Sequence, residues 1–426
     1  MNNVEEKDNN YHYVRIDEKL CNGCVLCMKA CPTQAIRVLD DGVAHIQGTC
    51  IECGNCIRAC PRGAITSVTA GKDALKMSKY HIVPVTSALY AQFGEDVMPN
   101  DILLAMRKAF DFVYDQSYTQ ELFNVATGLY INEQRSKDDA HWPLISPMCP
   151  VVNRLIAFRF PSLLKHILPF ATPLEIVCRE GKKWLSKKYE CNPEDIKVFS
   201  VTACPAQMMA FNETLSGEIS RIDGAIGINE IYDLIKSDIH EVQEPDEHIV
   251  LNYLSGVGIG WAMSGGEVAG LDVGRHLAVS GIKTTIRYLQ SMEMGLLKDI
   301  DYVELRACRE GCIGGAFSVT DKYAAKNSLN KLIRIFGSEK RVNFSYAKKL
   351  YREGWFDTTR KLVPLSSKSS HLSIHEGIKR AEDIETLLKT LPRKECGVCG
   401  CPDCRTFAED VVDGMTSIDK CIFMRH

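Results

Sequence analysis

The sequence lacks the features of a membrane protein and of a nucleic-acid-binding protein. It contains no apolar run of the roughly 18–20 residues that a transmembrane helix needs. Its formal net charge is −3, so no excess of positive charge favours nucleic acid or an anionic membrane surface. Its first residues, MNNVEEKDNNYHYVRID, are polar and acidic, unlike a secretory signal. We therefore expect a cytoplasmic protein that has no membrane span and binds no nucleic acid.

Cysteine, in contrast, is abundant. The chain of 426 residues contains 19 cysteines, of which eight lie in residues 21–60, five in 396–421 and six between these segments. Disulfides persist mainly in oxidising compartments. Because a cytoplasmic location is expected, metal binding is the better interpretation of so many cysteines.

The N-terminal cysteines form an internal repeat. Residues 21–32 read CNGCVLCMKACP and residues 50–61 read CIECGNCIRACP, so each follows C-x2-C-x2-C-x3-C-P. This is the bacterial ferredoxin pattern, in which the fourth cysteine of each run ligates the other [4Fe–4S] cluster. The predicted ligands are Cys21, Cys24, Cys27 and Cys60 for cluster one, and Cys50, Cys53, Cys56 and Cys31 for cluster two. Two zinc sites are the alternative, but zinc sites rarely need eight cysteines in a doubled pattern.

The C-terminal cysteines suggest a third cluster. Four of them, Cys396, Cys399, Cys404 and Cys421, have a spacing that resembles the small four-cysteine iron–sulfur domain of electron-transfer and sensory proteins. Cys401 is a fifth cysteine in the loop, either a bystander or a substitute ligand, and structural zinc is an alternative metal. A helix is predicted over 373–391, with these residues on its apolar face: Ile374, Ile378, Ala381, Ile384, Leu387 and Leu388.

The middle of the chain alternates short apolar runs with amphipathic segments, which is typical of an α/β fold. Four of its cysteines fall at strand ends or in loops, at Cys149, Cys204, Cys308 and Cys312. Loops at strand ends are where α/β proteins usually place their sites. Four thiolates that converge from distant loops would hold one more [4Fe–4S] cluster.

These loops, in this order, resemble the three ligand loops of the [FeFe]-hydrogenases, as found in the sensory-type branches. The resembling segments are PVTSALYAQFG (84–94), FDFVYDQSYTQEL (110–122), SPMCPVVNRLIAFRFPSL (146–163), VTACPAQ (201–207), GVGIGWAMSGGEVAGL (256–271) and ELRACREGCIGGA (304–316). The resemblance implies that Cys149, Cys204, Cys308 and Cys312 ligate the cubane of the H-cluster. Cys312 would also bridge to a diiron subsite, and the glycines would let the backbone approach closely.

The chain departs from that family around the diiron subsite. Met148 stands where active hydrogenases have a proton-relaying cysteine, and Gln207 stands where they have a lysine that binds a cyanide ligand. Arg306 replaces a methionine. In one interpretation Arg306 supplies the missing charge, and a slow or sensory diiron site survives. In the other, the diiron subsite is absent and the site holds only a cubane. Glu267 and Glu304 belong either to another proton route or to a structural network.

The resemblance implies a hydrogenase-like, two-lobed α/β catalytic domain, an N-terminal α+β bacterial-ferredoxin domain and a small C-terminal α-helical iron–sulfur domain. Their predicted bounds are 1–75, 76–365 and 366–426. The expected function is slow or sensory hydrogen oxidation or proton reduction. The alternatives are an electron-transfer subunit or redox sensor without diiron, and a carrier in cluster assembly. Expected partners are a ferredoxin or another electron-transfer subunit, a signalling protein, or a second copy of the chain.

Overall fold

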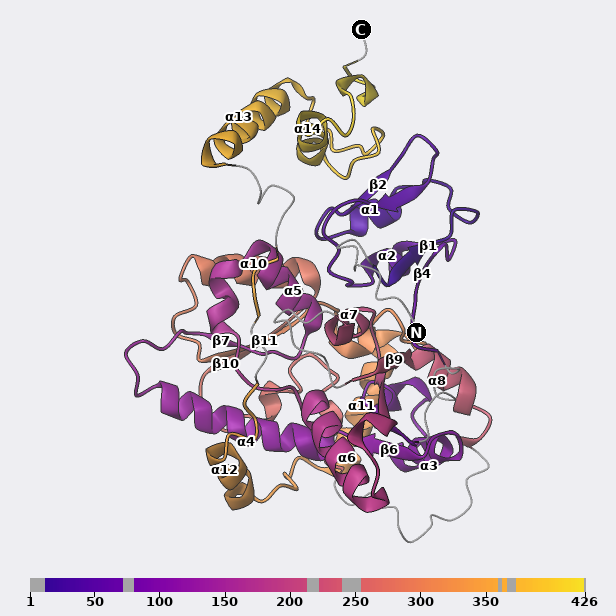
Figure 1. Ribbon diagram of the computed structural model, residues 1–426, viewed down its shortest axis with the longest axis vertical. Coiled ribbons are helices and arrows are strands. Elements are labelled where there is room, and N and C mark those ends of the chain that lie inside the picture. The colour runs from indigo at the N-terminus through magenta and orange to yellow at the C-terminus, as the bar shows by residue number, and fades with distance from the viewer. Residues whose placement is uncertain are drawn as a thin grey trace. The chain divides into compact units, whose positions relative to one another are not determined.

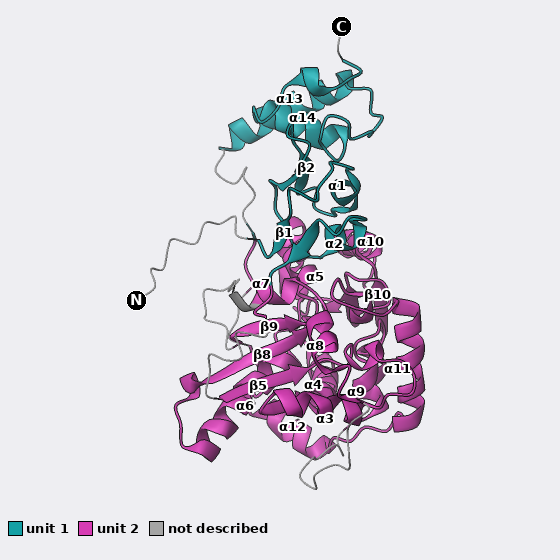
Figure 2. Ribbon diagram, turned by 90° about the vertical axis from the view of Figure 1, so that its right-hand side faces the viewer, with its two compact units in different colours: residues 1–68, 365–426 teal, residues 69–364 magenta. Residues whose placement is uncertain are grey.

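The computed structural model describes residues 12–71, 80–212, 222–239, 254–358, 362–365 and 373–424 (Figure 1). The chain divides into two compact units, which Figure 2 colours separately. Unit 1 combines Met1–Val68 with Leu365–His426, and unit 2 is Thr69–Pro364. The two terminal iron–sulfur segments, which we predicted as separate domains, therefore lie in one compact unit. The predicted boundaries at 75/76 and next to residue 366 fall outside the described residues, and the division into three domains stays a prediction.

The N-terminal part of unit 1 has the doubled architecture that its sequence repeat predicts. Strand β1 (Val14–Ile16) pairs antiparallel with β4 (Ile65–Ser67), and β2 (Ile36–Val38) pairs antiparallel with β3 (Ala44–Ile46). Each cysteine run contains one short helix, α1 (Leu26–Ala30) or α2 (Asn55–Ala59). Apolar side chains of the strands and cysteines of both runs share one small core.

The C-terminal part of unit 1 is helical, as predicted. Helix α13 (Ile374–Thr390) begins at a capping box between Ser373 and Glu376, and α14 (Cys404–Val412) begins at Asp403. A 3₁₀ turn, η9 (Ile418–Lys420), precedes the last cysteine. The predicted apolar face of α13 is only partly correct. Ile384 and Leu388 are buried, but Ile374 and Ile378 are 86% and 55% exposed, because the small C-terminal core lies under only the second half of the helix.

The described residues of unit 2 form two parallel sheets, each at the centre of one lobe. The first sheet has the order β6-β5-β8-β9 and comprises β5 (Tyr80–Val85), β6 (Phe112–Asp115), β8 (Ile196–Thr202) and β9 (Gly224–Gly227). The second sheet has the order β10-β11-β7 and comprises β7 (Leu144–Ile145), β10 (His276–Ser280) and β11 (Tyr302–Arg306). Residues of β5 and β8 are almost all buried, as expected for parallel strands covered on both faces.

Helices complete the two lobes (Figure 1). They are α3 (Pro99–Ala109), α4 (Ser117–Gln134), α5 (Pro150–Arg159), α6 (Pro173–Tyr189), α7 (Ala206–Asn212), α8 (Ile228–Ile235), α9 (Gly256–Gly260), α10 (Ile282–Glu293), α11 (Lys322–Phe336) and α12 (Phe344–Arg352). Short 3₁₀ turns include η2 (Tyr90–Gln92), η3 (Pro161–His166), η4 (Pro193–Asp195), η6 (Val268–Gly270) and η7 (Cys312–Gly314). One apolar core surrounds Val83 and Val201 of the first sheet, and a second surrounds Leu144 and Tyr302 of the second. The predicted two-lobed α/β class is confirmed. Within the described residues, no helix is both long and apolar enough to cross a membrane.

Candidate metal centre

Three strands from the two parallel sheets deliver the four predicted cysteines of unit 2. Cys149 lies in the loop after β7, Cys204 lies two residues after β8, and Cys308 lies two residues after β11. Strands β7 and β11 are hydrogen-bonded neighbours in parallel register, so the loops that follow them begin side by side. Cys149 is the residue at which α5 begins, and Cys312 starts the η7 turn.

Backbone contacts join the Cys204 loop to the loop of Cys308 and Cys312, and join the latter loop to the glycine-rich segment. The Phe317 amide donates to the Ala203 carbonyl at 3.0 Å, and the Cys312 amide donates to the Ala262 carbonyl at 2.7 Å. Gly315 permits this approach, because a Cβ atom there would lie 2.3 Å from the Ala203 carbonyl oxygen. The prediction that these glycines allow close backbone approach is confirmed at this position.

The structure brings the four thiols into one electrostatic neighbourhood. Burial raises the pKa of Cys204 well above its ordinary value, and repulsion from the other three cysteines raises it further. The pKa of Cys312 is raised to about 11, chiefly by burial, although Arg306 opposes the increase. Burial also raises the pKa of Cys149, whose sulfur accepts backbone hydrogen bonds from Val152 and Ala307. Thiols of this kind stay protonated unless a metal stabilises the thiolate form. Four adjacent sulfur donors fit a [4Fe–4S] cluster, and their ligation of one stays a prediction.

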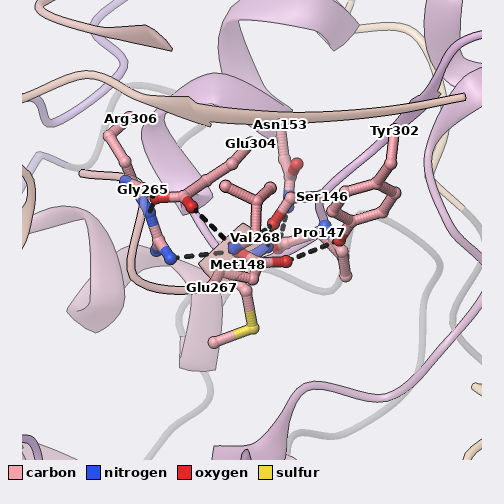
Figure 3. Close-up of polar contacts among 10 residues, drawn as sticks. All are labelled: Ser146, Pro147, Met148, Asn153, Gly265, Glu267, Val268, Tyr302, Glu304 and Arg306. Carbon is pink, nitrogen blue, oxygen red and sulfur yellow. Dashed lines mark hydrogen bonds and ion pairs between the residues drawn. The ribbon is translucent and has the colours of Figure 1, made fainter. Parts of the chain in front are cut away.

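A buried ion cluster lies beside these loops (Figure 3). The Arg306 guanidinium donates from Nη2 to Glu267 Oε2 at 3.0 Å and from Nε to Glu304 Oε1 at 3.1 Å. The three side chains are at most 4% exposed. Glu304 also accepts the backbone amides of Gly265 and Val268. The carboxylates therefore compensate the charge of Arg306 and fix the glycine-rich segment to strand β11.

Glu267 connects this cluster to the first cysteine loop. It accepts the Ser146 hydroxyl at 2.8 Å and the Tyr302 hydroxyl at 2.5 Å (Figure 3). Ser146 in turn accepts the Met148 backbone amide at 3.2 Å, next to Cys149. This arrangement favours the structural role of Glu267 and Glu304. Sequence reasoning missed Ser146 and Tyr302, because nothing in the local pattern marks a partner that is 121 or 35 residues away.

Glu267 gives the folded chain a pH dependence. Its pKa is raised from 4.5 to about 7, first by burial and then by repulsion from Glu304, against the opposing effects of Arg306, Tyr302 and Ser146. The folded state therefore holds this proton more tightly than the unfolded state does. The resulting stabilisation is complete below pH 4.5 and is lost as the pH rises through about 7.

We expect wild-type protein to lose about 3 kcal/mol more stability than Glu267→Gln between about pH 4.5 and pH 8. The measurement is denaturant unfolding at several pH values, followed by tryptophan fluorescence. Parallel pH profiles for the two proteins would contradict the assignment.

Met148 and Gln207, the other two residues that differ from those of the resembling family, have ordinary neighbours. Met148 is partly buried against the core of the second lobe. Gln207 is partly exposed, and its backbone amide hydrogen-bonds the Cys204 sulfur. Their predicted catalytic roles are untested and stay predictions.

Among the described residues of unit 1, each predicted ligand set lines a cavity of its own. Cavity one is lined by Cys21, Cys24, Cys27 and Cys60, cavity two by Cys31, Cys50, Cys53 and Cys56, and the C-terminal cavity by Cys396, Cys399, Cys404 and Cys421. The four-sulfur donor sets fit [4Fe–4S] clusters. Cys401 is not among the residues that line the C-terminal cavity, and its sulfur donates to Asp410 Oδ2 at 3.3 Å.

Known protein families match all three parts of the chain. Residues 13–61 match a 4Fe-4S dicluster domain, residues 79–273 match the C-terminal domain of the iron only hydrogenase large subunit, and residues 391–423 match a putative Fe-S cluster family. The hydrogenase match includes Cys149 and Cys204 but ends before Cys308 and Cys312.

A curated relative supports the same family. The chain is 28% identical over 254 residues to the periplasmic [Fe] hydrogenase large subunit of Nitratidesulfovibrio vulgaris. The alignment covers 55% of this chain, and the chain spans only 60% of the length of that relative.

Solved structures share the fold. The [FeFe]-hydrogenase HydA(deltaEFG) aligns with a TM-score of 0.54 at 15% identity over 68% of this chain and 95% of its own. A variant of apo HydA1 from Chlamydomonas reinhardtii aligns with a TM-score of 0.54 at 16% identity over 71% of this chain and 97% of its own. At such identities these likenesses show the fold alone. The matching family model and the curated relative show that the chain is also similar in sequence to the hydrogenases.

Proposed function

We propose that the chain is an iron–sulfur oxidoreductase with three relay clusters in unit 1 and a fourth cluster in unit 2. Cys149, Cys204, Cys308 and Cys312 would hold the fourth. Such a cluster supplies one-electron chemistry. The protein supplies the ligand loops, their shielding from water and the charges around them. The matches of the chain to two iron–sulfur families and to a hydrogenase family support this proposal.

The charged partners of Arg306 favour an electron-transfer or redox-sensing role without a diiron subsite. The resemblance to hydrogenases implies anionic cyanide ligands on that subsite and a lysine to bind them. Here Gln207 provides no charge, and the charge of Arg306 is already compensated by the paired Glu304 carboxylate, with Glu267 as a second partner whose pKa is raised. Binding further anions beside this compensated and fully buried pair would cost electrostatic free energy. This compensation is the observation that carries the proposal.

Slow or sensory hydrogen turnover is the second candidate. Arginine has five N–H donors, and the two bonds to the carboxylates leave others that could face an anion. Arg306 also lies close enough to Cys149 and Cys312 for their charges to raise its pKa. Under this candidate, the diiron subsite would sit next to Cys312.

Infrared spectroscopy separates the two candidates. The protein is produced together with hydrogenase maturation factors and examined for the bands of CO and cyanide ligands. We expect no such bands, no measurable hydrogen turnover, and about sixteen iron atoms per chain, equivalent to four [4Fe–4S] clusters. Bands accompanied by about eighteen iron atoms would establish the second candidate instead.

The proposed partner is a redox protein, either a ferredoxin or another electron-transfer subunit, and a redox sensor would require a signalling partner. A homodimer or a larger complex also stays a prediction. So does the cytoplasmic location, since the name of the curated relative places that protein in the periplasm.

A further inference from the structure

A buried ion pair joins the two halves of unit 1. Arg37 of β2 donates to both carboxylate oxygens of Asp410 in α14, and the Nη2–Oδ1 distance is 3.0 Å. The two residues are only 7% and 5% exposed, although they lie 373 positions apart in the sequence. Such bidentate, buried arginine–carboxylate pairs fix geometry as well as charge. A loose surface contact between the two segments would not need an ion pair that is removed from water.

Backbone contacts surround the ion pair. The Val38 amide donates to the Gly400 carbonyl at 2.9 Å, so the loop before α14 continues the hydrogen bonding of strand β2. Gly400 has a φ of +83°, and a Cβ atom there would lie 2.0 Å from the Val38 carbonyl oxygen. The Lys29 ammonium donates to the carbonyls of Glu395 and Pro402, each at 2.5 Å. This contact surface is therefore specific in both side chain and backbone.

The fifth cysteine belongs to this contact surface. Cys401 is 4% exposed and donates to the same Asp410 oxygen that accepts the Arg37 Nε–H. It lies between two residues of the C-terminal cavity, Cys399 and Cys404, but does not line that cavity. Its side chain contacts both Asp410 and the cavity-lining Cys399, and so helps to hold Asp410 in place.

The contact surface also lies between the lining residues of two of the cavities. Val38 lines cavity one, and Gly397 and Cys399 line the C-terminal cavity. The Val38–Gly400 hydrogen bond lies between these sets of lining residues. A Cβ atom on Gly397 would lie 3.1 Å from Met28 and Lys29 side-chain atoms of α1, in the first cysteine run.

We propose that the Arg37–Asp410 pair, positioned by Cys401, docks the C-terminal iron–sulfur segment on the ferredoxin-like segment so that their clusters exchange electrons directly. One electron leaves the cluster of one cavity, which is oxidised, and reduces the cluster of the other. The exchange rests on the proposed function, whereas the docking does not. Arg37, Asp410 and Cys401 act as positioning residues.

Amide hydrogen exchange of the full-length, cluster-loaded chain tests the docking. We expect the Val38 amide to be protected in the wild type and to exchange at least about tenfold faster in Arg37→Met. Arg380→Met is the matched control, because Arg380 forms a bidentate pair with Asp413 inside the C-terminal segment, at 2.7 and 2.8 Å. The control should leave Val38 protected. If Arg37→Met fails to fold, Asp410→Asn replaces it and should show the same loss in weaker form. Equal protection in the folded Arg37 or Asp410 variant and the control would overturn the docking.

Alkylation of Cys401 provides a second readout. In the loaded wild type, Cys401 should resist a thiol reagent, and Arg37→Met should label at least about tenfold faster at this position by mass spectrometry. Rapid labelling of the wild type would contradict the role of Cys401.

Electron paramagnetic resonance tests the electron exchange. The fully reduced wild type should show magnetic coupling between the C-terminal cluster and a cluster of the ferredoxin-like segment, and Arg37→Met should lose it. An uncoupled C-terminal signal in the wild type would overturn the exchange. Absence of iron from the C-terminal cavity would instead contradict the proposed function, and Val38 protection would still decide the docking.

Discussion

Replacing Arg306 with methionine will lower the free energy of unfolding of unit 2 by about 3–5 kcal/mol. The substitution leaves Glu267 and Glu304, which are 1% and 0% exposed, without their shared cation. Methionine fills much of the same space, so lost packing contributes less than the uncompensated Glu304 carboxylate and the lost hydrogen bonds to both glutamates do. The same loss should loosen the loop of Cys149, because Glu267 holds that loop through Ser146.

The unfolding of unit 2 has a specific probe. All four tryptophans, Trp142, Trp184, Trp261 and Trp355, lie in this unit, so denaturant curves followed by their fluorescence report on it alone. Arg275→Met is the control, since Arg275 and its partner Asp299 are 70% and 89% exposed, and it should cost at most about 1 kcal/mol. The double variant Arg306→Met/Glu267→Gln should recover part of the loss. Equal stability of Arg306→Met and Arg275→Met would contradict the buried charge cluster.

Gly315→Ala is the second substitution with a large expected effect. The new methyl group would lie 2.3 Å from the Ala203 carbonyl oxygen and 2.9 Å from the Cys312 carbonyl oxygen, and both neighbours are backbone atoms. The loops of Cys204 and Cys312 must move apart to accept it. We expect Gly315→Ala to lower the free energy of unfolding of unit 2 by about 1–3 kcal/mol. We also expect unit 2 to lose its cluster, while unit 1 keeps its iron.

Gly260→Ala is the matched control for this result. Its methyl group would meet nothing closer than Ile333 Cδ1 at 3.4 Å, which is ordinary contact, and Gly260 lies in helix α9 of the same unit. Iron content per chain and the tryptophan unfolding curve are measured for both variants. Retention of all iron by Gly315→Ala would show that the two loops need not touch.

The sequence was most informative where ligands are local. Three cysteines of each ferredoxin run lie within seven residues, so spacing predicted these three lining residues of each cavity, and the known ferredoxin pattern added the fourth from the other run. The four cysteines of unit 2 were harder, because they meet only after two sheets place three strand ends together. The resemblance to a known family, rather than spacing, was what linked them.

Charge partners could not be predicted in the same way. Arg306 reaches Glu267 across 39 residues, and the pairing depends on how the glycine-rich segment folds back on β11. Arg37 and Asp410 belong to opposite ends of the chain, and no local pattern connects them. The apolar face predicted for α13 included Ile374 and Ile378, since periodicity describes a helix surface but not how far the neighbouring core extends along it.

Iron content of wild type, Cys204→Ala and Cys178→Ala tests most directly whether thiols from three loops of unit 2 hold one cluster. Each full-length protein is loaded anaerobically, and its iron is measured per folded chain. We predict about sixteen iron atoms in the wild type and in Cys178→Ala, whose cysteine is buried in α6, and about twelve in Cys204→Ala. The same iron content in all three proteins would contradict a cluster in unit 2 held by Cys204.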